Sequence, residues 1–413
     1  MLKNYLKIAW KVLLRRKFFT FISLFGISFT LMVLMVATSL FDHTFGPQVP
    51  ERDMDNLLFV NMMREEHSEG YSSSGPASYY FLDRNVRTLQ TPEKVSVSSV
   101  FFQVNSYINN RKLALDIKYT DREFWDILEF EFLEGGPFGQ QEVAGASRVA
   151  VINENTRNQY FGEGEALGKT IEVDQVKYKV VGVVKDVPVL RVNSYADIWV
   201  PITLRSQDFN KPGLRGLYFA TIKAKSPGDI PKIKEEYAAM LKKLENQHAV
   251  KGTKLSSFPD TILEAFARTF LGRGTEPGLG ILYSILAGVT FLFMLLPAIN
   301  LVSINISRIM ERSSEIGVRK AFGATSSTII GQFIVENVFL TLLGGILGFA
   351  LSAAVLKLIN DSGVIVYADL GLNLRVFAWG LLLSLIFGLI AGVYPAYKMS
   401  RLKAVEALKG GSK

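Results

Sequence analysis

The sequence predicts a membrane α-helical protein with four transmembrane helices, one plus three, and a large α+β extracytoplasmic domain inserted between the first and second. Apolar runs that reach the roughly 20 residues needed to cross a bilayer core of about 30 Å occupy 18–41, 277–307, 325–356 and 376–397. Basic residues gather beside these runs, and the segment between the first two mixes helix-like and strand-like patterns. These observations predict the layout before any motif is considered.

The distribution of charge predicts the topology. Lys and Arg cluster in 1–17, 308–324 and 398–413, and juxtamembrane basic residues mark the cytoplasmic side. Four crossings put all three clusters on that side, so both termini are expected to be cytoplasmic and 42–276 and the short loop 357–375 periplasmic. The net charge of +8 therefore indicates membrane orientation, and no nucleic-acid partner is expected.

The N-terminal segments predict an anchor and a surface helix. The first run is about 24 residues long, beyond the usual 7–15 of a cleaved signal, so we expect a retained helix at 18–41. Within 1–17, Leu2, Leu6, Ala9 and Leu13 share one stripe, as in a helix that lies in the inner headgroup layer. A plain cytoplasmic extension of the first span is the alternative.

The intervening segment 42–276 is expected to fold without disulfides, because the chain contains no cysteine. Alternating or β-branched runs predict strands, and periodic runs predict helices. The expected strands are 57–62, 95–107, 148–152, 170–173, 178–184, 198–202 and 218–223, and the expected helices are 78–88, 120–127, 154–160 and 231–245. The mixture is typical of an α+β domain.

Small residues recur every four positions in the last three runs. They include Gly344 and Gly348 in the third run and Gly388 and Gly392 in the fourth. Such rows let helix backbones approach closely in lipid. They predict helix packing, either within a tight bundle or at a dimer seam.

Residues that resemble catalytic or ligand-binding groups have simpler explanations. Gly162, Gly168 and Lys169 resemble a phosphate-binding loop, but the glycine spacing is wrong and a turn is expected. His43, His67 and His248 are scattered and are interpreted as surface residues. No bound metal or cofactor and no catalytic set is predicted.

Glu336 is the one charged residue in the four runs. A structural role near the interface and a proton relay are both compatible with its position, and the structural role is preferred because the carboxylate is isolated.

The cytoplasmic loop 308–324 is short, charged and amphipathic. Its residues Glu315, Ile316, Gly317, Val318, Arg319, Lys320, Ala321, Phe322, Gly323 and Ala324 resemble the signature of MacB/FtsX-type ABC transporter permeases. Segments 132–135, 149–152, 160–162, 167–171, 180–186 and 197–201 resemble the periplasmic core domain of that family and keep its order. Lys403-Ala404 departs from the family, where a proline is usual.

This resemblance implies a permease subunit that couples ATP hydrolysis to motion of its periplasmic domain, for export or extraction of substrate. The expected partners are a cytoplasmic ATPase dimer, a second four-span subunit that is identical or paralogous, membrane lipid, and in some systems a periplasmic adaptor or lipoprotein. ATP would be used by the partner and not by this chain, which would lie in the inner membrane. By resemblance, Glu315, Gly317, Arg319, Lys320 and Gly323 meet the ATPase.

Two alternatives remain open from the sequence. One is an FtsX-like regulator that activates a periplasmic enzyme without moving substrate. The other is a membrane-anchored enzyme, which the lack of a catalytic set disfavours. The cargo is not identified by these residues.

Overall fold

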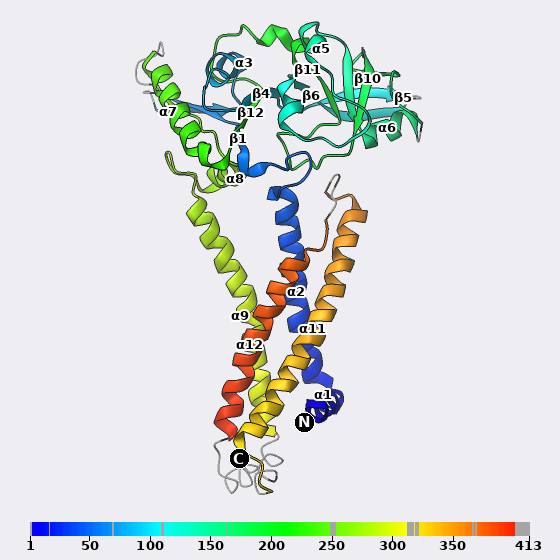
Figure 1. Ribbon diagram of the computed structural model, residues 1–413, viewed down its shortest axis with the longest axis vertical. Helices are drawn as coiled ribbons and strands as arrows, with labels where there is room; N and C mark the ends of the chain where they lie inside the picture. The colour runs from blue at the N-terminus through cyan, green and yellow to red at the C-terminus, as the bar shows by residue number, and fades with distance from the viewer. Residues whose placement is uncertain are drawn as a thin grey trace. The chain divides into compact units, whose positions relative to one another are not determined.

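The chain forms two compact units in a computed structural model that describes residues 2–15, 17–67, 70–108, 111–162, 164–247, 253–311, 318, 322–365, 367 and 370–400. The first unit, here the membrane unit, comprises Met1–Phe41, Tyr283–Val364 and Asp369–Lys413. The second, here the ectodomain, comprises Asp42–Leu282 and Ile365–Ala368. The ectodomain thus contains the predicted segment 42–276 together with a piece of the predicted loop 357–375 (Figure 1).

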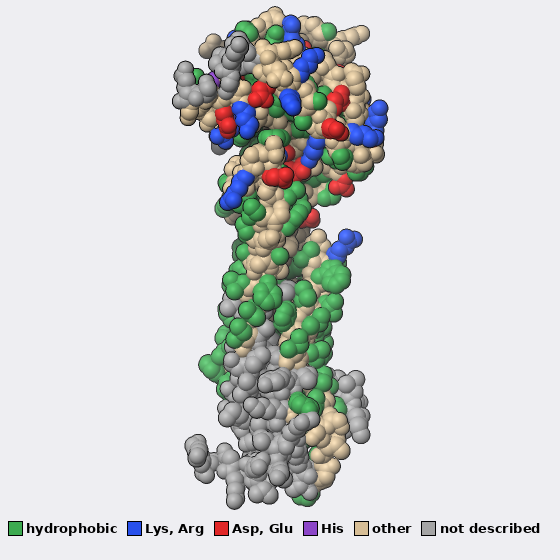
Figure 2. Space-filling view, turned by 90° about the vertical axis from the view of Figure 1, so that its left-hand side faces the viewer, with side chains coloured by type: hydrophobic (Ala, Val, Ile, Leu, Met, Phe, Trp, Pro, Cys, Tyr) green, Lys and Arg blue, Asp and Glu red, His purple; other side chains and the backbone are tan. Residues whose placement is uncertain are grey.

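The membrane unit is helical. Its helices are α1 (Leu2–Arg15), α2 (Lys17–Phe45), α9 (Leu279–Glu311), α11 (Ser326–Ser362) and α12 (Leu374–Ser400). Among the described residues, α2 and α11 are long and apolar enough to cross a membrane, and α9 and α12 have shorter apolar stretches at Leu279–Phe293 and Leu374–Ile390. Where the side chains of this unit are drawn in colour, green hydrophobic ones are frequent on the visible face (Figure 2).

The N-terminal helix α1 packs on α11. Ala9 and Leu13 of α1 are buried, and the ring of Trp10 lies edge-on to Phe339 with centroids 6.2 Å apart. Thr20 of α2 donates a hydrogen bond to the Leu13 carbonyl at 3.0 Å. The described half of the predicted stripe in 1–17 therefore faces a neighbouring helix.

The ectodomain is built on a ten-stranded mixed sheet. Its path is β1-β12-β4-β6-β11-β8-β10-β7, with β5 paired to β6 and β9 paired to β10. The β6–β11 and β8–β10 pairs are parallel, and the other pairs are antiparallel. The strands are β1 (Leu57–Val60), β4 (Lys94–Ser99), β5 (Phe102–Ile108), β6 (Arg111–Thr120), β7 (Phe132–Gly135), β8 (Val149–Asn153), β9 (Thr170–Val173), β10 (Val176–Val184), β11 (Ile198–Pro201) and β12 (Tyr218–Lys223).

A small second sheet and short helices complete the ectodomain. The small sheet has the order β13-β2-β3, from strands β2 (Met63–Glu66), β3 (Ser72–Gly75) and β13 (Lys254–Ser256). The helices are α3 (Tyr79–Phe81), α4 (Glu123–Ile127), α5 (Gln140–Ala144), α6 (Glu154–Phe161), α7 (Ile230–Gln247) and α8 (Ile262–Leu271). Among these, α4 packs on β4, α6 on β8 and α8 on β1.

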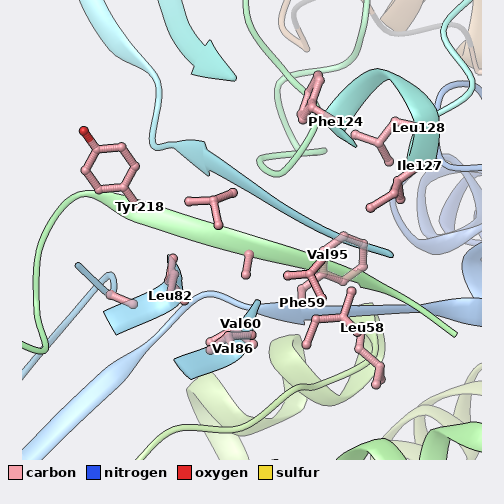
Figure 3. Packing of buried hydrophobic residues seen from close by; sticks show 14 of the residues in the cluster. Leu58, Phe59, Val60, Leu82, Val86, Val95, Phe124, Ile127, Leu128 and Tyr218 are labelled. Carbon is pink, nitrogen blue, oxygen red and sulfur yellow. The ribbon is translucent and has the colours of Figure 1, made fainter. Parts of the chain in front are cut away.

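Two hydrophobic clusters lie on opposite faces of the large sheet. Trp199 belongs to one cluster, whereas its strand neighbours Ile198 and Val200 belong to the other. This follows from the two-residue repeat of a strand. Figure 3 shows part of the first cluster, to which β1 contributes Leu58, Phe59 and Val60, β4 contributes Val95, and the segment between them contributes Leu82 and Val86. Trp125 and Trp199 pack edge-on at 6.1 Å.

Candidate functional site

The last turn of helix α2 is fixed by an arginine from a distant loop. The Nη2 atom of Arg191 donates to the carbonyls of His43 at 3.0 Å and Gly46 at 2.7 Å. The last carbonyls of a helix lack partners within the helix, so a buried end needs such a donor. A Cβ at Gly46 would lie 2.4 Å from the Asp42 oxygen, so the chain requires glycine where it leaves α2.

A buried ion pair holds this arginine. Arg191 Nη1 lies 3.1 Å from Glu51 Oε2, and both side chains are 1% exposed. Ser194 Oγ donates to the other Glu51 oxygen at 2.7 Å. A buried ion pair is tolerated when further hydrogen bonds satisfy its atoms, and here those bonds go to the backbone of α2 and to Ser194. We call Glu51, Arg191 and Ser194, with the His43 and Gly46 carbonyls, the α2 clamp.

The loop that contains Arg191 and Ser194, here the clamp loop, is also held by hydrogen bonds from the large sheet. Lys118 of β6 is fully buried, and its Nζ donates to the carbonyls of Val192 at 2.8 Å and Asn193 at 2.9 Å. Burial lowers the pKa of Lys118 to about 7, and the charge of Glu51 opposes that shift. Trp199 of β11 donates from Nε1 to the Ser194 carbonyl at 3.1 Å. The end of α2 is therefore connected to central strands of the large sheet.

The surface assignment of His43 was wrong. His43 is 2% exposed, because α2 continues beyond the apolar run to Phe45 and its last turn packs into the ectodomain. His67 is partly buried and stacks on Tyr71 with ring centroids 4.3 Å apart. His248 lies outside the described residues. No group of three or more His, Cys, Asp or Glu side chains suited to a metal ion occurs among the described residues.

A second polar contact brings the segment between α11 and α12 to the sheet. Tyr367 donates from its hydroxyl to Asp197 Oδ1 at 2.9 Å and accepts from Asn155 Nδ2 at 2.8 Å. Asp197 also accepts from the Asp116 amide at 2.8 Å and from Asn153 Nδ2 at 3.0 Å. Burial raises the pKa of Asp197 above its ordinary value, and these hydrogen bonds oppose that shift.

The backbone at Tyr367 adopts an unusual conformation. Its φ is +59°, in the left-handed region that bulky residues rarely occupy. Burial, together with the nearby Asp197 charge, raises the pKa of Tyr367. The phenol therefore stays protonated at neutral pH and serves as a donor to Asp197.

Three of the four glycines predicted to pack helices lie close to residues of a neighbouring helix. A Cβ at Gly344 of α11 would lie 2.7 Å from Ile27 of α2, and one at Gly348 would lie 3.0 Å from Leu31. A Cβ at Gly388 of α12 would lie 3.1 Å from Thr341. Gly392 lies in α12, with surroundings outside the described residues.

Glu336 is buried on α11 beside other polar residues. It is 3% exposed, and Gln332, Asn337 and Thr341 on the same helix are also buried. A polar stripe of this kind faces the interior of a helical unit, as expected for polar groups within apolar helices.

The predicted ATPase-contact residues lie mostly outside the described chain. Glu315, Gly317, Arg319 and Lys320 are not described. Gly323 has a φ of +89°, directly after a turn in which the Phe322 amide donates to the Val318 carbonyl at 3.1 Å. Phe322 is 89% exposed and Val318 is 46% exposed.

Family models match both parts of the chain. One, described as the MacB-like periplasmic core domain, matches residues 20–240. Another, described as the FtsX-like permease C-terminal domain, matches residues 287–404. The chain belongs to the MacB/FtsX-type ABC transporter permease family. It is accordingly a membrane protein with an extracytoplasmic domain.

Individual relatives of this permease are distant. It is 23% identical over 356 residues to the uncharacterized ABC transporter permease YknZ of Bacillus subtilis (strain 168), covering 86% of this chain and 85% of that one. It is 28% identical to the macrolide export ATP-binding/permease protein MacB of Pasteurella multocida, covering 72% of this chain but only 44% of that one. A solved extracellular domain of YknZ from Gram-positive bacteria is 14% identical and covers 48% of this chain and 99% of that one, with a TM-score of 0.35.

The polar contacts of the permease fall in both family segments. The α2 clamp lies within the MacB-like segment, since it is formed by residues between His43 and Ser194. Tyr367 lies in the FtsX-like segment but contacts Asp197 of the MacB-like segment. The sequence patterns identified neither contact: Glu51 and Arg191 are 140 residues apart, and each occurs in a loop where charged residues are usually solvated.

Proposed function

We propose that this chain is the force-transmitting permease subunit of an ABC complex, with four membrane spans at 18–41, 277–307, 325–356 and 376–397. Both termini and the loop 308–324 lie in the cytoplasm, and the ectodomain lies outside the cytoplasmic membrane. A separate cytoplasmic ATPase hydrolyses ATP. The resulting motion of the helices moves the ectodomain, which acts in export or extraction of substrate.

The observation that carries this proposal is the α2 clamp. Transmission along a helix requires that its far end be fixed to the body it moves. Arg191 binds two carbonyls at the end of α2, and its ion pair with Glu51 is buried with both side chains 1% exposed. An unpaired charge at this depth would cost several kcal/mol, so separating the clamp is expensive and α2 is suited to pull on the sheet.

The Tyr367 contact supports a second connection. Segment Ile365–Ala368 is counted with the ectodomain, although it joins α11 to α12. Its hydrogen bonds to Asp197 and Asn155 give these two helices their own link to the sheet. Movement of α2 and movement of α11 and α12 would therefore both reach β11 and its neighbours.

The cytoplasmic loop supports the position of the ATPase. Val318 and Phe322 expose apolar side chains in a turn that ends at Gly323. An exposed apolar pair flanked by Glu315, Arg319 and Lys320 is suited to dock in a groove on a partner. Homologues named as ATP-binding/permease proteins are consistent with a partner ATPase for this chain, which spans 44% and 58% of those two proteins.

The assembly would contain a second four-span subunit, identical or paralogous, and membrane lipid around the helices. A periplasmic adaptor or lipoprotein is a further candidate partner. No cofactor is assigned to this chain, because ATP would bind to the partner.

Co-purification with a cytoplasmic ATPase tests the proposal. The charge-reversed double variant Glu315→Lys with Arg319→Glu is expected to lose the ATPase while the melting temperature of the ectodomain stays unchanged. Unchanged capture of the ATPase by this variant would contradict the loop assignment. ATPase turnover that rises with a purified wall hydrolase, and with no exported substrate, would favour an FtsX-like regulator instead.

A further inference from the structure

Helix α8 exposes aromatic side chains on the surface of the ectodomain. Phe266 is 40% exposed and Phe270 is 72% exposed, whereas the adjacent Ala267 is fully buried. The helix is well capped: the Thr261 amide donates to Glu264 at 2.8 Å and Thr261 Oγ1 accepts from the Glu264 amide. This apolar edge is therefore a fixed feature and not a frayed end.

Polar and aromatic contacts fix the orientation of α8. Arg268 binds both oxygens of Asp260, at 2.5 and 2.9 Å, and its guanidinium lies 3.7 Å from the centre of the Phe258 ring. Phe266 packs edge-on against Phe45, the last residue of α2, with centroids 5.0 Å apart. The exposed edge therefore begins at the end of α2.

The other end of α8 adjoins the start of α9. A Cβ at Gly278 would lie 2.7 Å from the Leu271 carbonyl, and Gly278 has a φ of +83°. Arg273 and Glu276 exchange two backbone hydrogen bonds of 3.0 Å across the turn between them. Helix α9 begins at Leu279, directly after Gly278. Ile281, Tyr283 and Ile285 of α9 are also exposed.

Another exposed apolar side chain occurs next to the α2 clamp in the sequence. Leu190 is 46% exposed and directly precedes Arg191, which holds the end of α2. Exposed apolar side chains thus occur on α8, at the start of α9 and directly before Arg191. Helices that carry aromatic residues beside a membrane span bind the interfacial region of a bilayer.

We propose that the Phe266–Phe270 edge of α8 lies in the headgroup region of the outer leaflet and holds the ectodomain against the lipid surface. The occupant is lipid because α8 packs against Phe45, the last residue of the candidate span α2, and ends beside Gly278, which directly precedes α9. This inference rests on α2 and α9 being membrane spans. It assigns α8 a role beyond force transmission, the binding of lipid.

Depth-dependent quenching tests the proposal on the full chain, which has no cysteine of its own. Phe270→Cys carries an environment-sensitive nitrobenzoxadiazole dye in nanodiscs of phosphatidylcholine and phosphatidylglycerol. Nitroxide lipids labelled in the headgroup are expected to reduce its fluorescence more than lipids labelled deep in the acyl chain. Tyr107→Cys, 68% exposed on β5, is the matched control and is expected to lose no fluorescence.

A third site separates failure of this inference from failure of the proposed function. Phe25→Cys on α2, 55% exposed, is expected to respond most to the deep nitroxide. If the dye at 25 is quenched and the dye at 270 behaves like that at 107, the α8 inference is wrong and the membrane assignment stands. If the fluorescence of the dye at position 25 is also not quenched by nitroxide lipid, the proposed membrane topology is wrong. Dye self-quenching at 270 that disappears on dilution with unlabelled chain, without lipid quenching, would identify a second copy and also refute the inference.

Discussion

Replacing Arg191 with methionine removes the centre of the α2 clamp. The substitution leaves the Glu51 carboxylate buried at 1% exposure with Ser194 as its remaining bond partner in the clamp, and it removes the donor to the His43 and Gly46 carbonyls. Breaking a buried pair on one side costs about 3–5 kcal/mol. For a domain of about 150–250 residues, each kcal/mol lowers the melting temperature by about 2–4 °C. The expected decrease is therefore about 6–20 °C.

Intrinsic tryptophan fluorescence during heating measures this effect on the full chain. Trp125 and Trp199 are 8% and 0% exposed in the ectodomain core, so their emission reports unfolding there. Arg52→Met, on an exposed arginine next to Glu51, is the matched control and should change the melting temperature little.

The double variant Glu51→Met with Arg191→Met distinguishes the ion pair from general loss of packing. It removes both charges, so it is expected to melt above Arg191→Met, although below the native chain because the His43 and Gly46 carbonyls still lack their donor. A decrease of under about 2 °C for Arg191→Met, well below the value derived from a buried pair, would refute the reasoning. So would a double variant that melts below the single one.

Three further predictions follow from other contacts. Gly344→Leu is expected to destabilise the membrane unit by about 1–3 kcal/mol through overpacking, since a Cβ at this position would lie 2.7 Å from Ile27. Gly280→Leu is the control, because a Cβ at Gly280 would meet no side chain within 4 Å. Resistance to trypsin during heating measures the stability of both variants. Tyr367→Phe removes two hydrogen bonds and is expected to lower ectodomain stability by about 1–3 kcal/mol, whereas Tyr107→Phe should not; equal melting temperatures would contradict the contact. Burial raises the pKa of Asp186 from 3.8 to about 6, an effect to which Glu154 and Asp197 add and which the Asn155 amide opposes. The folded state then binds more protons than the unfolded state between pH 4 and 6, so this group lowers stability as pH rises through that window. Asp186→Asn should therefore raise the melting temperature at pH 7.5 and leave it unchanged at pH 4, and a gain of similar size at both pH values would exclude this explanation.

Local sequence patterns predicted several regular elements, although strand β6 (Arg111–Thr120) was not predicted and the predicted strand 95–107 is divided between β4 and β5. Strand β12 occupies the predicted 218–223, and α7 extends the predicted 231–245 by one or two residues at each end. These elements follow from periodicity, which a single segment contains. Helix α8 was not predicted, although Thr261 and Glu264 form a capping box at its start. Its apolar residues Ile262, Phe266 and Phe270 recur every four positions, as in a helix. That signal was available in the sequence and was missed.

The polar contacts were not predictable in the same way. Glu51, Lys118 and Arg191 are separated by many residues and meet only when β6, β11 and the clamp loop are assembled. A single sequence gives no reason to pair one loop arginine with one glutamate. The burial of His43 likewise depends on the extension of α2 beyond its apolar run. The polar residues that follow position 41 did not predict this extension.

Side-specific labelling of single cysteines tests the proposed transmission across the membrane most directly. The proposal requires that the ectodomain and the loop that contacts the ATPase lie on opposite sides of the membrane. The native residues Tyr107, in the ectodomain, and Phe322, in the loop proposed to be cytoplasmic, are 68% and 89% exposed. The variants Tyr107→Cys and Phe322→Cys each introduce a single cysteine, because the chain contains none. With a membrane-impermeant maleimide, position 107 should react in intact cells and position 322 only after permeabilisation. Reaction of 322 in intact cells, or protection of 107, would contradict the proposal.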